Sequence, residues 1–176
     1  MRKYVKHFDL YDVDDKTLSA IKNLLQDTWK TVGRGRDGRN LNHNGINVTK
    51  VERVENVNLF IKYNTNRRHM LKSQRPFRKL EDIPSSSGQI LTMTKIDHLM
   101  LSDIDINRNE CYLFHGTKNT FHENIMSKGL DPRLSSGGAM FGTGVYTAES
   151  PSKADHYTGR LLRTVSTLQS WTLRST

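Results

Sequence analysis

Apolar residues recur at helical spacing near the start of the chain, which predicts a helix over residues 16–32. Asp14 and Asp15 precede this helix, and either carboxylate can cap its first turn. The glycine- and arginine-rich residues 33–40 that follow predict a loop. The apolar face of the expected helix consists of Leu18, Ile21, Leu24, Leu25 and Trp29.

The pattern then changes to the alternation that is typical of a strand. Ile46 and Val48 alternate with polar residues, which predicts a strand over residues 46–54. Asn56 follows the strand, and its side chain is of the kind that caps a helix. The apolar face expected for this second helix is formed by Leu59, Phe60, Tyr63 and Met70.

The middle of the chain predicts an irregular connection over residues 75–109. Pro76, Pro84 and the serine-rich residues 85–88 interrupt any long regular element. Apolar residues return between positions 90 and 101, where we expect local packing.

Regular spacing resumes after Glu110. Residues 111–114 predict a short strand with His115 at its end, and residues 145–147 predict another. Residues 119–128 predict a helix that ends at Gly129, with Phe121 and Ile125 facing inward. The pair formed by Ser150 and Pro151 is expected to cap and open a short helix.

The basic charge of the chain is concentrated away from this C-terminal part. The formal net charge is +9, of which residues 1–74 carry +7 and residues 111–176 carry +3, while the residues between them carry −1. A basic surface attracts nucleic acid, acidic partners or phosphate groups, but a solvated basic surface is the simpler interpretation. A nucleic-acid partner stays open, although no recognisable reader motif supports it.

The length and the remaining composition narrow the class of protein. A chain of 176 residues suits one domain, and no apolar run approaches the ~20 residues of a membrane span. The first residues do not form a secretory signal. Cys111 is the single cysteine, which excludes an internal disulfide and favours a reducing compartment, either nuclear or cytoplasmic.

Four segments together resemble the catalytic domain of the poly(ADP-ribose) polymerase family. They match in order and spacing: FHGT at 114–117, GL at 129–130, MFGTGVYTAE at 140–149, and SK followed by HY within 152–157. The resemblance implies a single α+β domain over residues 1–176, with ADP-ribosyltransferase-like split antiparallel sheets and flanking helices, incomplete at the C-terminus. The match is best over 111–159, and a tail over 160–176 is unmatched.

The family resemblance also implies a function. It identifies an NAD-dependent protein ADP-ribosyltransferase, a glycosyltransferase that cleaves the nicotinamide–ribose bond of NAD and transfers ADP-ribose to protein acceptors. NAD is the donor substrate, and no metal is implied. The alternative is a non-catalytic module that binds NAD or ADP-ribose.

The site residues that the resemblance implies all lie within the matched segments. His115 and Tyr146 are assigned to catalysis, and the NAD-binding set is His115, Gly116, Thr117, Tyr146 and Tyr157. A glycine lets one residue pair its N–H and C=O with both edges of a carboxamide, and aromatic faces stabilise a cationic nicotinamide ring. Taken singly, each residue also fits an ordinary structural role in a strand, a core or a turn.

Two departures from the family pattern weaken the expected activity. Ala154 stands where the family usually has a serine that bonds the carboxamide, and losing such a bond costs about 1 kcal/mol. The catalytic glutamate of the active members has no counterpart, because no Asp or Glu follows Asp155. We therefore expect an impaired enzyme, and exposed strand edges that leave the C-terminal half only marginally stable.

Overall fold

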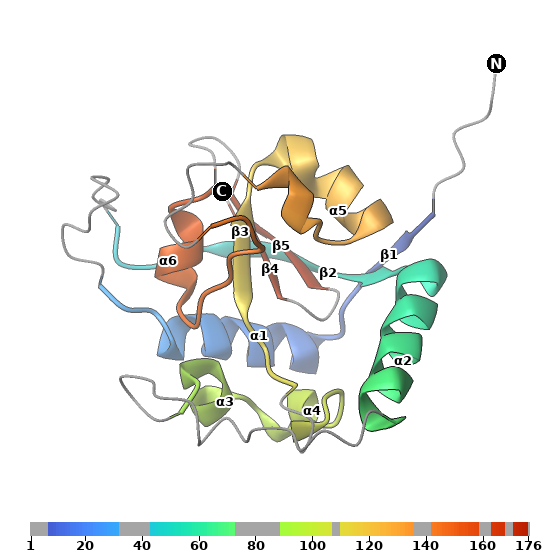
Figure 1. Cartoon of the computed structure of the whole chain (residues 1–176). Helices are drawn as coiled ribbons and strands as arrows, with labels where there is room; N and C mark the ends of the chain where they lie inside the picture. Colours follow the sequence, from blue (N-terminus) through green and yellow to red (C-terminus); the bar gives the residue numbers. More distant parts are fainter. Residues whose placement is uncertain are drawn as a thin grey trace.

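The fold was analysed in a computed structural model of the chain (Figure 1). Its described strands form one five-stranded antiparallel sheet in the order β1-β2-β5-β4-β3. The structure describes residues 7–31, 43–72, 89–106, 110–135 and 142–158, and the backbone of 163–167 and 171–175. The strands are β1 (Asp9–Asp12), β2 (Val48–Glu55), β3 (Phe114–Thr117), β4 (Arg163–Thr167) and β5 (Trp171–Ser175).

Helices surround this sheet, which confirms the α+β class, while the division into split sheets stays a prediction (Figure 1). None of the helices in the described part of the chain is long and apolar enough to span a membrane. The helices are α1 (Asp15–Asp27), α2 (Val57–Lys72), α3 (Leu91–Lys95), α4 (His98–Leu101), α5 (His122–Lys128) and α6 (Pro151–Asp155), with 3-10 turns η3 (Asn119–Phe121) and η4 (Pro132–Leu134).

Helix α1 provides much of the core. The Asp14 carboxylate accepts the amide of Thr17 at 2.8 Å, which confirms the expected cap and lowers the pKa of Asp14. Ile21 and Leu24, each 1% exposed, belong to the same buried cluster as Phe114 of β3. Burying such apolar side chains is the main stabilising term of a fold of this size. The helix ends at Asp27 rather than at residue 32, and residues 33–40 lie outside the described part of the chain.

Asn56 joins α2 to α5. Its side-chain oxygen accepts the amide of Leu59 at 3.1 Å, so the predicted helix cap is confirmed. Its side-chain nitrogen donates to the carbonyl oxygens of Met126 and Ser127 at 2.9 and 3.0 Å. One buried amide therefore satisfies backbone groups at the ends of two helices.

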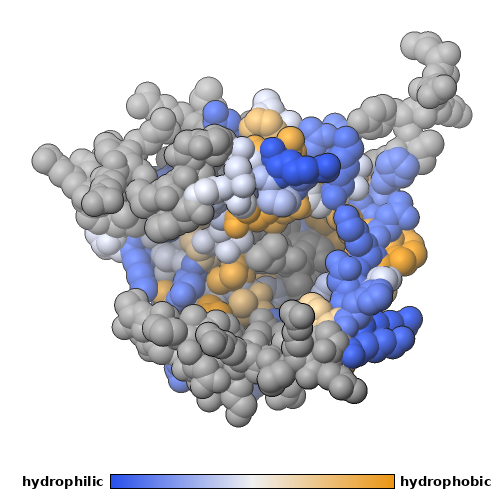
Figure 2. All heavy atoms as spheres, viewed as in Figure 1, coloured by the Kyte–Doolittle hydropathy of each residue, from blue (hydrophilic) through white to orange (hydrophobic). Residues whose placement is uncertain are grey.

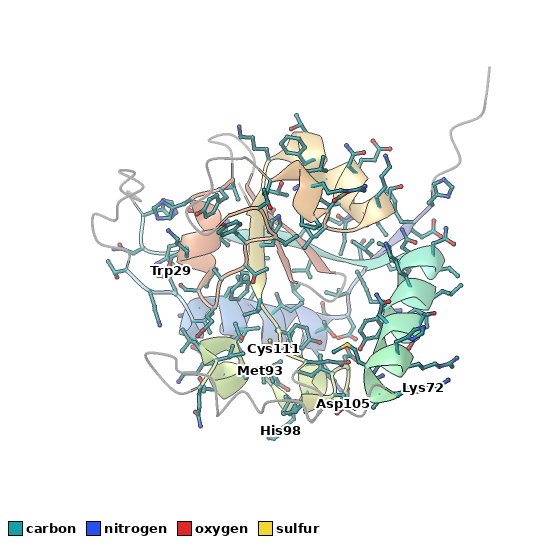
Figure 3. All side chains as sticks on the ribbon, in the orientation of Figure 1. Trp29, Lys72, Met93, His98, Asp105 and Cys111 are labelled. Carbon is teal, nitrogen blue, oxygen red and sulfur yellow. The ribbon has the colours of Figure 1, made fainter. Side chains whose placement is uncertain are left out.

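The apolar face that was predicted for α2 is not buried. Phe60 and Met70 are 64% and 50% exposed, and Figure 2 shows orange atoms beside blue ones at the edge of the molecule over this helix. Polar contacts hold α2 instead: Tyr63 donates to Glu110 at 2.5 Å, and Arg67 pairs with Asp105 at 3.0 Å. Figure 3 shows Asp105 near the C-terminal end of α2. Burial, reinforced by Glu110, raises the pKa of Tyr63 to about 12.

The irregular connection predicted over residues 75–109 contains two short helices. Helices α3 and α4 lie within it, and Asp97 caps α4 by accepting the amide of Leu99 at 2.8 Å. Thr92 and Met100 are buried, which confirms the expected local packing between 90 and 101. The described residues of this region are 89–106.

The C-terminal tail supplies the partner strand that was expected to be missing beside β3, although β3 remains the last strand of the sheet. Strands β4 and β5 form a hairpin between β2 and β3, and β3 pairs with β4 from Phe114 opposite Thr167 to Thr117 opposite Thr164. The expectation failed because these pairings join segments that are far apart in the sequence. The helix that was predicted to start at residue 119 begins at His122 instead. Phe121, which was expected to face inward, is 50% exposed. Gly129 does end that helix, with φ +81°.

Replacing Asn56 by alanine should destabilise the fold. Asn56→Ala removes the cap of α2 and leaves two carbonyl oxygens of α5 without their donor, which together should lower the free energy of unfolding by about 2–4 kcal/mol. Urea denaturation measures this difference. Asn58→Ala, at an exposed position in the same helix, is the matched control and should change stability by less than ~0.5 kcal/mol. Equal effects of the two substitutions would contradict the role of Asn56.

Candidate functional site

The site is built around strand β3. The strand spans Phe114–Thr117 instead of 111–114, so His115 lies inside it rather than at its end. Phe114 exchanges two backbone hydrogen bonds with Ala148, each of 2.8 Å, at the edge of β3. Residues 145–147 do not form the expected strand, and the pairing in this segment is limited to the bridge at Ala148.

The peptide groups of Gly116 point toward that same edge. Backbone groups of a strand alternate in direction, so Gly116 presents its N–H and C=O on the side where Phe114 meets Ala148. His115 and Thr117, one residue to either side, present theirs toward β4. A donor and an acceptor therefore stand together at the outer edge of β3, which is the arrangement that a carboxamide requires.

The ring of His115 is oriented by the segment beside β3. Its Nδ1 lies 2.8 Å from the carbonyl oxygen of Tyr146. Because a carbonyl oxygen only accepts, Nδ1 must carry the hydrogen and donate. In the neutral ring, Nε2 is then an acceptor, suited to a hydroxyl group. Thr117, also in the expected binding set, is buried.

Helix α6 packs directly against Gly116. A Cβ at this position would stand 1.7 Å from the carbonyl oxygen of Ala154, far inside van der Waals contact. The same oxygen accepts the amide of Tyr157 at 3.0 Å. Gly116 is therefore required by the packing of β3 on α6, in addition to any role toward a ligand.

The two tyrosines of the expected site flank this contact. Tyr157 follows α6 and is 50% exposed, with the Lys153 ammonium 5.9 Å from its ring centre. Tyr146 is partly buried, and its hydroxyl donates to the carbonyl oxygen of Gly142 at 2.7 Å. The His115 side chain bonds the Tyr146 carbonyl oxygen, and the Tyr157 amide bonds the carbonyl oxygen of Ala154, which packs on Gly116, so the structure brings these expected residues near Gly116.

A hydrogen bond between His43 and a buried carboxylate holds α6 in place. The side chain of Asp155 is fully buried, and its Oδ2 lies 2.8 Å from Nε2 of His43. Thr158 donates to Oδ1 of the same carboxylate at 3.1 Å. Sequence reasoning missed this pair, since the two residues are 112 positions apart and neither belongs to a recognisable motif.

The side chains of Ser152 and Glu149, near α6, are engaged within the fold. Ser152 is 0% exposed and bonds the hydroxyl of Ser150 at 2.7 Å, which accepts the amide of Lys30. Ser152 thus does not replace the hydroxyl that is missing at Ala154. The Glu149 carboxylate accepts the amide of Leu91 at 2.7 Å, which gives it a structural role at the start of α3.

Adding a methyl group to Gly116 should disrupt the contact between β3 and α6. Gly116→Ala places its Cβ against the backbone of Ala154, and we expect a loss of about 3 kcal/mol or more in the free energy of unfolding. Gly144→Ala is the matched control, because no atom lies within 4 Å of its added Cβ. Thermal unfolding of the two variants measures the difference, and a Gly116→Ala protein as stable as Gly144→Ala would refute the close packing.

Comparison with protein families identifies the family of this domain. The family profile for the poly(ADP-ribose) polymerase catalytic domain matches residues 25–164, most of the chain. The match includes β3, α6 and all five residues of the expected binding set. Members of this family use NAD as their substrate, and their reaction is ADP-ribosyl transfer. The chain therefore belongs to the poly(ADP-ribose) polymerase catalytic-domain family.

Proposed function

We propose that this chain binds NAD with its nicotinamide at the outer edge of β3. The observation that carries the proposal is the N–H and C=O pair of Gly116, which points away from β4. The half-exposed Tyr157 is bonded through its amide to Ala154, the residue that packs on Gly116. The reaction is cleavage of the nicotinamide–ribose bond, followed by transfer of ADP-ribose to a protein acceptor.

The carboxamide of nicotinamide is bound by Gly116. Its amide nitrogen donates to the carbonyl oxygen of the strand, and its oxygen accepts the strand N–H. Two hydrogen bonds from one residue fix both the position and the rotation of the carboxamide. Ala154 adds no third bond, so binding is weaker than at a site with serine by about 1 kcal/mol.

The nicotinamide ring of NAD is cationic, so it is attracted to the faces of Tyr157 and Tyr146. Half of the Tyr157 surface is exposed and accessible to such a ring. The Lys153 ammonium already lies over this ring and competes for its electron-rich face. Stacking by the cationic ring therefore requires Lys153 to move or to occupy the opposite face.

His115 contributes to binding on the ribose side. Its Nδ1–H is directed at the carbonyl oxygen of Tyr146, which leaves Nε2 to accept a ribose hydroxyl. The fixed tautomer orients the donor substrate before the glycosidic bond breaks. Thr117 is buried, so its part is to support the strand rather than to present its hydroxyl at the surface.

Breaking the glycosidic bond develops positive charge on the ribose, and a carboxylate stabilises such a state. Asp155 is fully buried and paired with His43, and Glu149 is bonded to the amide of Leu91, so neither is placed for this task. No Asp or Glu follows Asp155 in the 176 residues. We therefore propose that these residues alone bind NAD but transfer ADP-ribose poorly. The second candidate is a module that only binds NAD or ADP-ribose, and it rests on the same pair of Gly116 peptide groups.

A nicotinamide mimic should stabilise the protein. Benzamide presents the same carboxamide on an aromatic ring, and at 100 times its Kd it should add about 2.7 kcal/mol, or roughly 5–10 °C in Tm. Benzoate, which lacks the amide donor, should add little. Tyr157→Ala should abolish the benzamide shift, whereas Tyr11→Ala, at an exposed tyrosine of β1, should retain it. No shift in the unaltered protein at saturating benzamide would overturn the proposed nicotinamide site.

Transfer is tested separately with NAD that is labelled in its adenylate part. We expect these 176 residues, incubated with labelled NAD, to acquire no more label than with labelled free ADP-ribose, which reports non-enzymatic attachment. The physical reason is the missing carboxylate for the developing ribose cation. Clear NAD-dependent labelling, suppressed by benzamide, would show instead that another group supplies that charge.

A further inference from the structure

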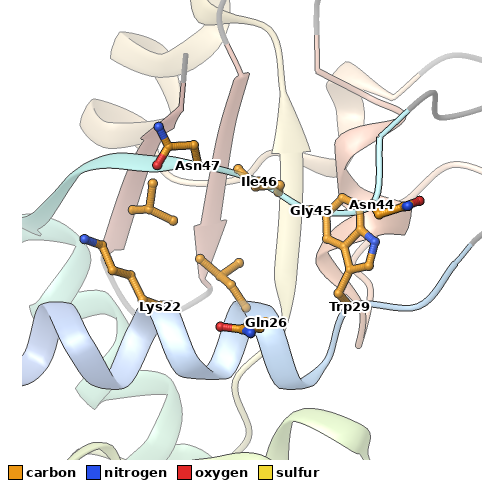
Figure 4. A pocket seen from close by; sticks show the side chains of 9 residues that line it. Lys22, Gln26, Trp29, Asn44, Gly45, Ile46 and Asn47 are labelled. Carbon is orange, nitrogen blue, oxygen red and sulfur yellow. The ribbon is translucent and has the colours of Figure 1, made fainter.

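A pocket of about 460 Å³ opens between α1 and the segment that leads into β2 (Figure 4). Its volume is within the range of roughly 300–1,000 Å³ that is typical of small-molecule sites. None of the residues assigned above to nicotinamide or ribose lines it. Its apolar wall is provided by Leu25, Ile46 and Val48.

One end of the pocket is aromatic. Trp29, just beyond the end of α1, lies beside Asn44 and Gly45 at one end of the pocket in Figure 4. Its indole ring is held by the tilted ring of His43, with 5.7 Å between centroids. A partly buried indole with a fixed orientation provides a surface on which a flat aromatic group can stack.

The opposite end is cationic. Figure 4 shows Lys22 far from Trp29 along α1, and seven residues of helix correspond to about 10 Å. No acidic residue is among those that line the pocket. A ligand that reaches both ends must join an aromatic ring through a spacer to an anionic group, which Lys can hold as a point charge.

Amide groups also line the pocket. Gln26, Asn44 and Asn47 each offer a donor and an acceptor within the pocket. Such groups bind the hydroxyl and ring-nitrogen edges of a nucleoside better than a purely apolar ligand. A nucleoside monophosphate combines these three features: an aromatic ring, a polar spacer and an anionic group.

The pocket is also connected to α6. His43, which contacts Trp29, pairs with the buried carboxylate of Asp155, and the amide of Lys30 donates to Ser150 at 3.2 Å. Both bonds join the rim of the pocket to the helix that packs on Gly116. A ligand that restrains Trp29 and Asn44 therefore also restrains the helix beside the nicotinamide site.

We propose that this pocket is a second binding site, for a nucleoside monophosphate that stacks on Trp29 and places its phosphate at Lys22. Its occupation favours the arrangement of α6 that binds nicotinamide. The binding stands independently of the proposed function, whereas the coupling rests on it. The two sites lie on different elements, so each can be disabled without the other.

The probe is adenosine 5′-monophosphate, measured by isothermal titration calorimetry. It should bind at least tenfold more tightly than adenosine, which lacks the anion, and than ribose 5-phosphate, which lacks the ring. Lys22→Glu should weaken this binding at least tenfold. Lys16→Glu, an exposed lysine at the other end of α1, is the matched control and should bind as the unaltered protein does.

The outcomes separate this proposal from the proposed function. Tyr157→Ala should retain the binding of the monophosphate, and saturating monophosphate should tighten benzamide binding about fivefold in the unaltered protein but not in Lys22→Glu. If the unaltered protein binds the monophosphate but not benzamide, the proposed function is contradicted and the second site is not. Monophosphate binding that is absent, or unchanged by Lys22→Glu, would overturn the second site. A bound monophosphate with no effect on benzamide would overturn the coupling.

Discussion

The close approach of β3 and α6 at Gly116 is the constraint on which the rest of the site depends. The carbonyl oxygen of Ala154 occupies the space that any side chain at residue 116 would need. This contact brings Tyr157 to β3 and leaves the other direction of the Gly116 peptide groups, along the outer edge of the strand, for a ligand. In the proposed function, one glycine thus serves packing and recognition at once, because the two use different directions around the same Cα.

The parts of the fold that local chemistry determines were predictable from the sequence. The caps at Asp14 and Asn56 and the end of α5 at Gly129 depend on side chains next to the element that they terminate. The family segments around His115 also identified the family, since their spacing is a property of the chain. The bounds of the strands in these segments differ from the prediction. Strand β3 begins at Phe114, and the segment that was predicted as a second strand forms only a bridge at Ala148.

The features that the sequence did not reveal depend on contacts between distant segments. Strands β4 and β5 acquire their place only by pairing with β3 and β2, so their composition alone did not indicate a completed sheet. The apolar residues of α2 suggested a buried face, yet the helix is held by the ion pair of Arg67 with Asp105, and Phe60 stays exposed. The pairing of His43 with Asp155 gives no signal in the local sequence, and it leaves this carboxylate bonded within the fold.

The most direct test of the site is the NMR response of individual backbone amides in β3 to saturating benzamide. The structure directs the amide of Gly116 toward the ligand edge and that of His115 toward β4. The Gly116 resonance should therefore shift strongly, with slower hydrogen exchange, while the His115 amide should change much less. Binding of benzamide that leaves the Gly116 amide unchanged would contradict the central claim that this strand edge holds the carboxamide.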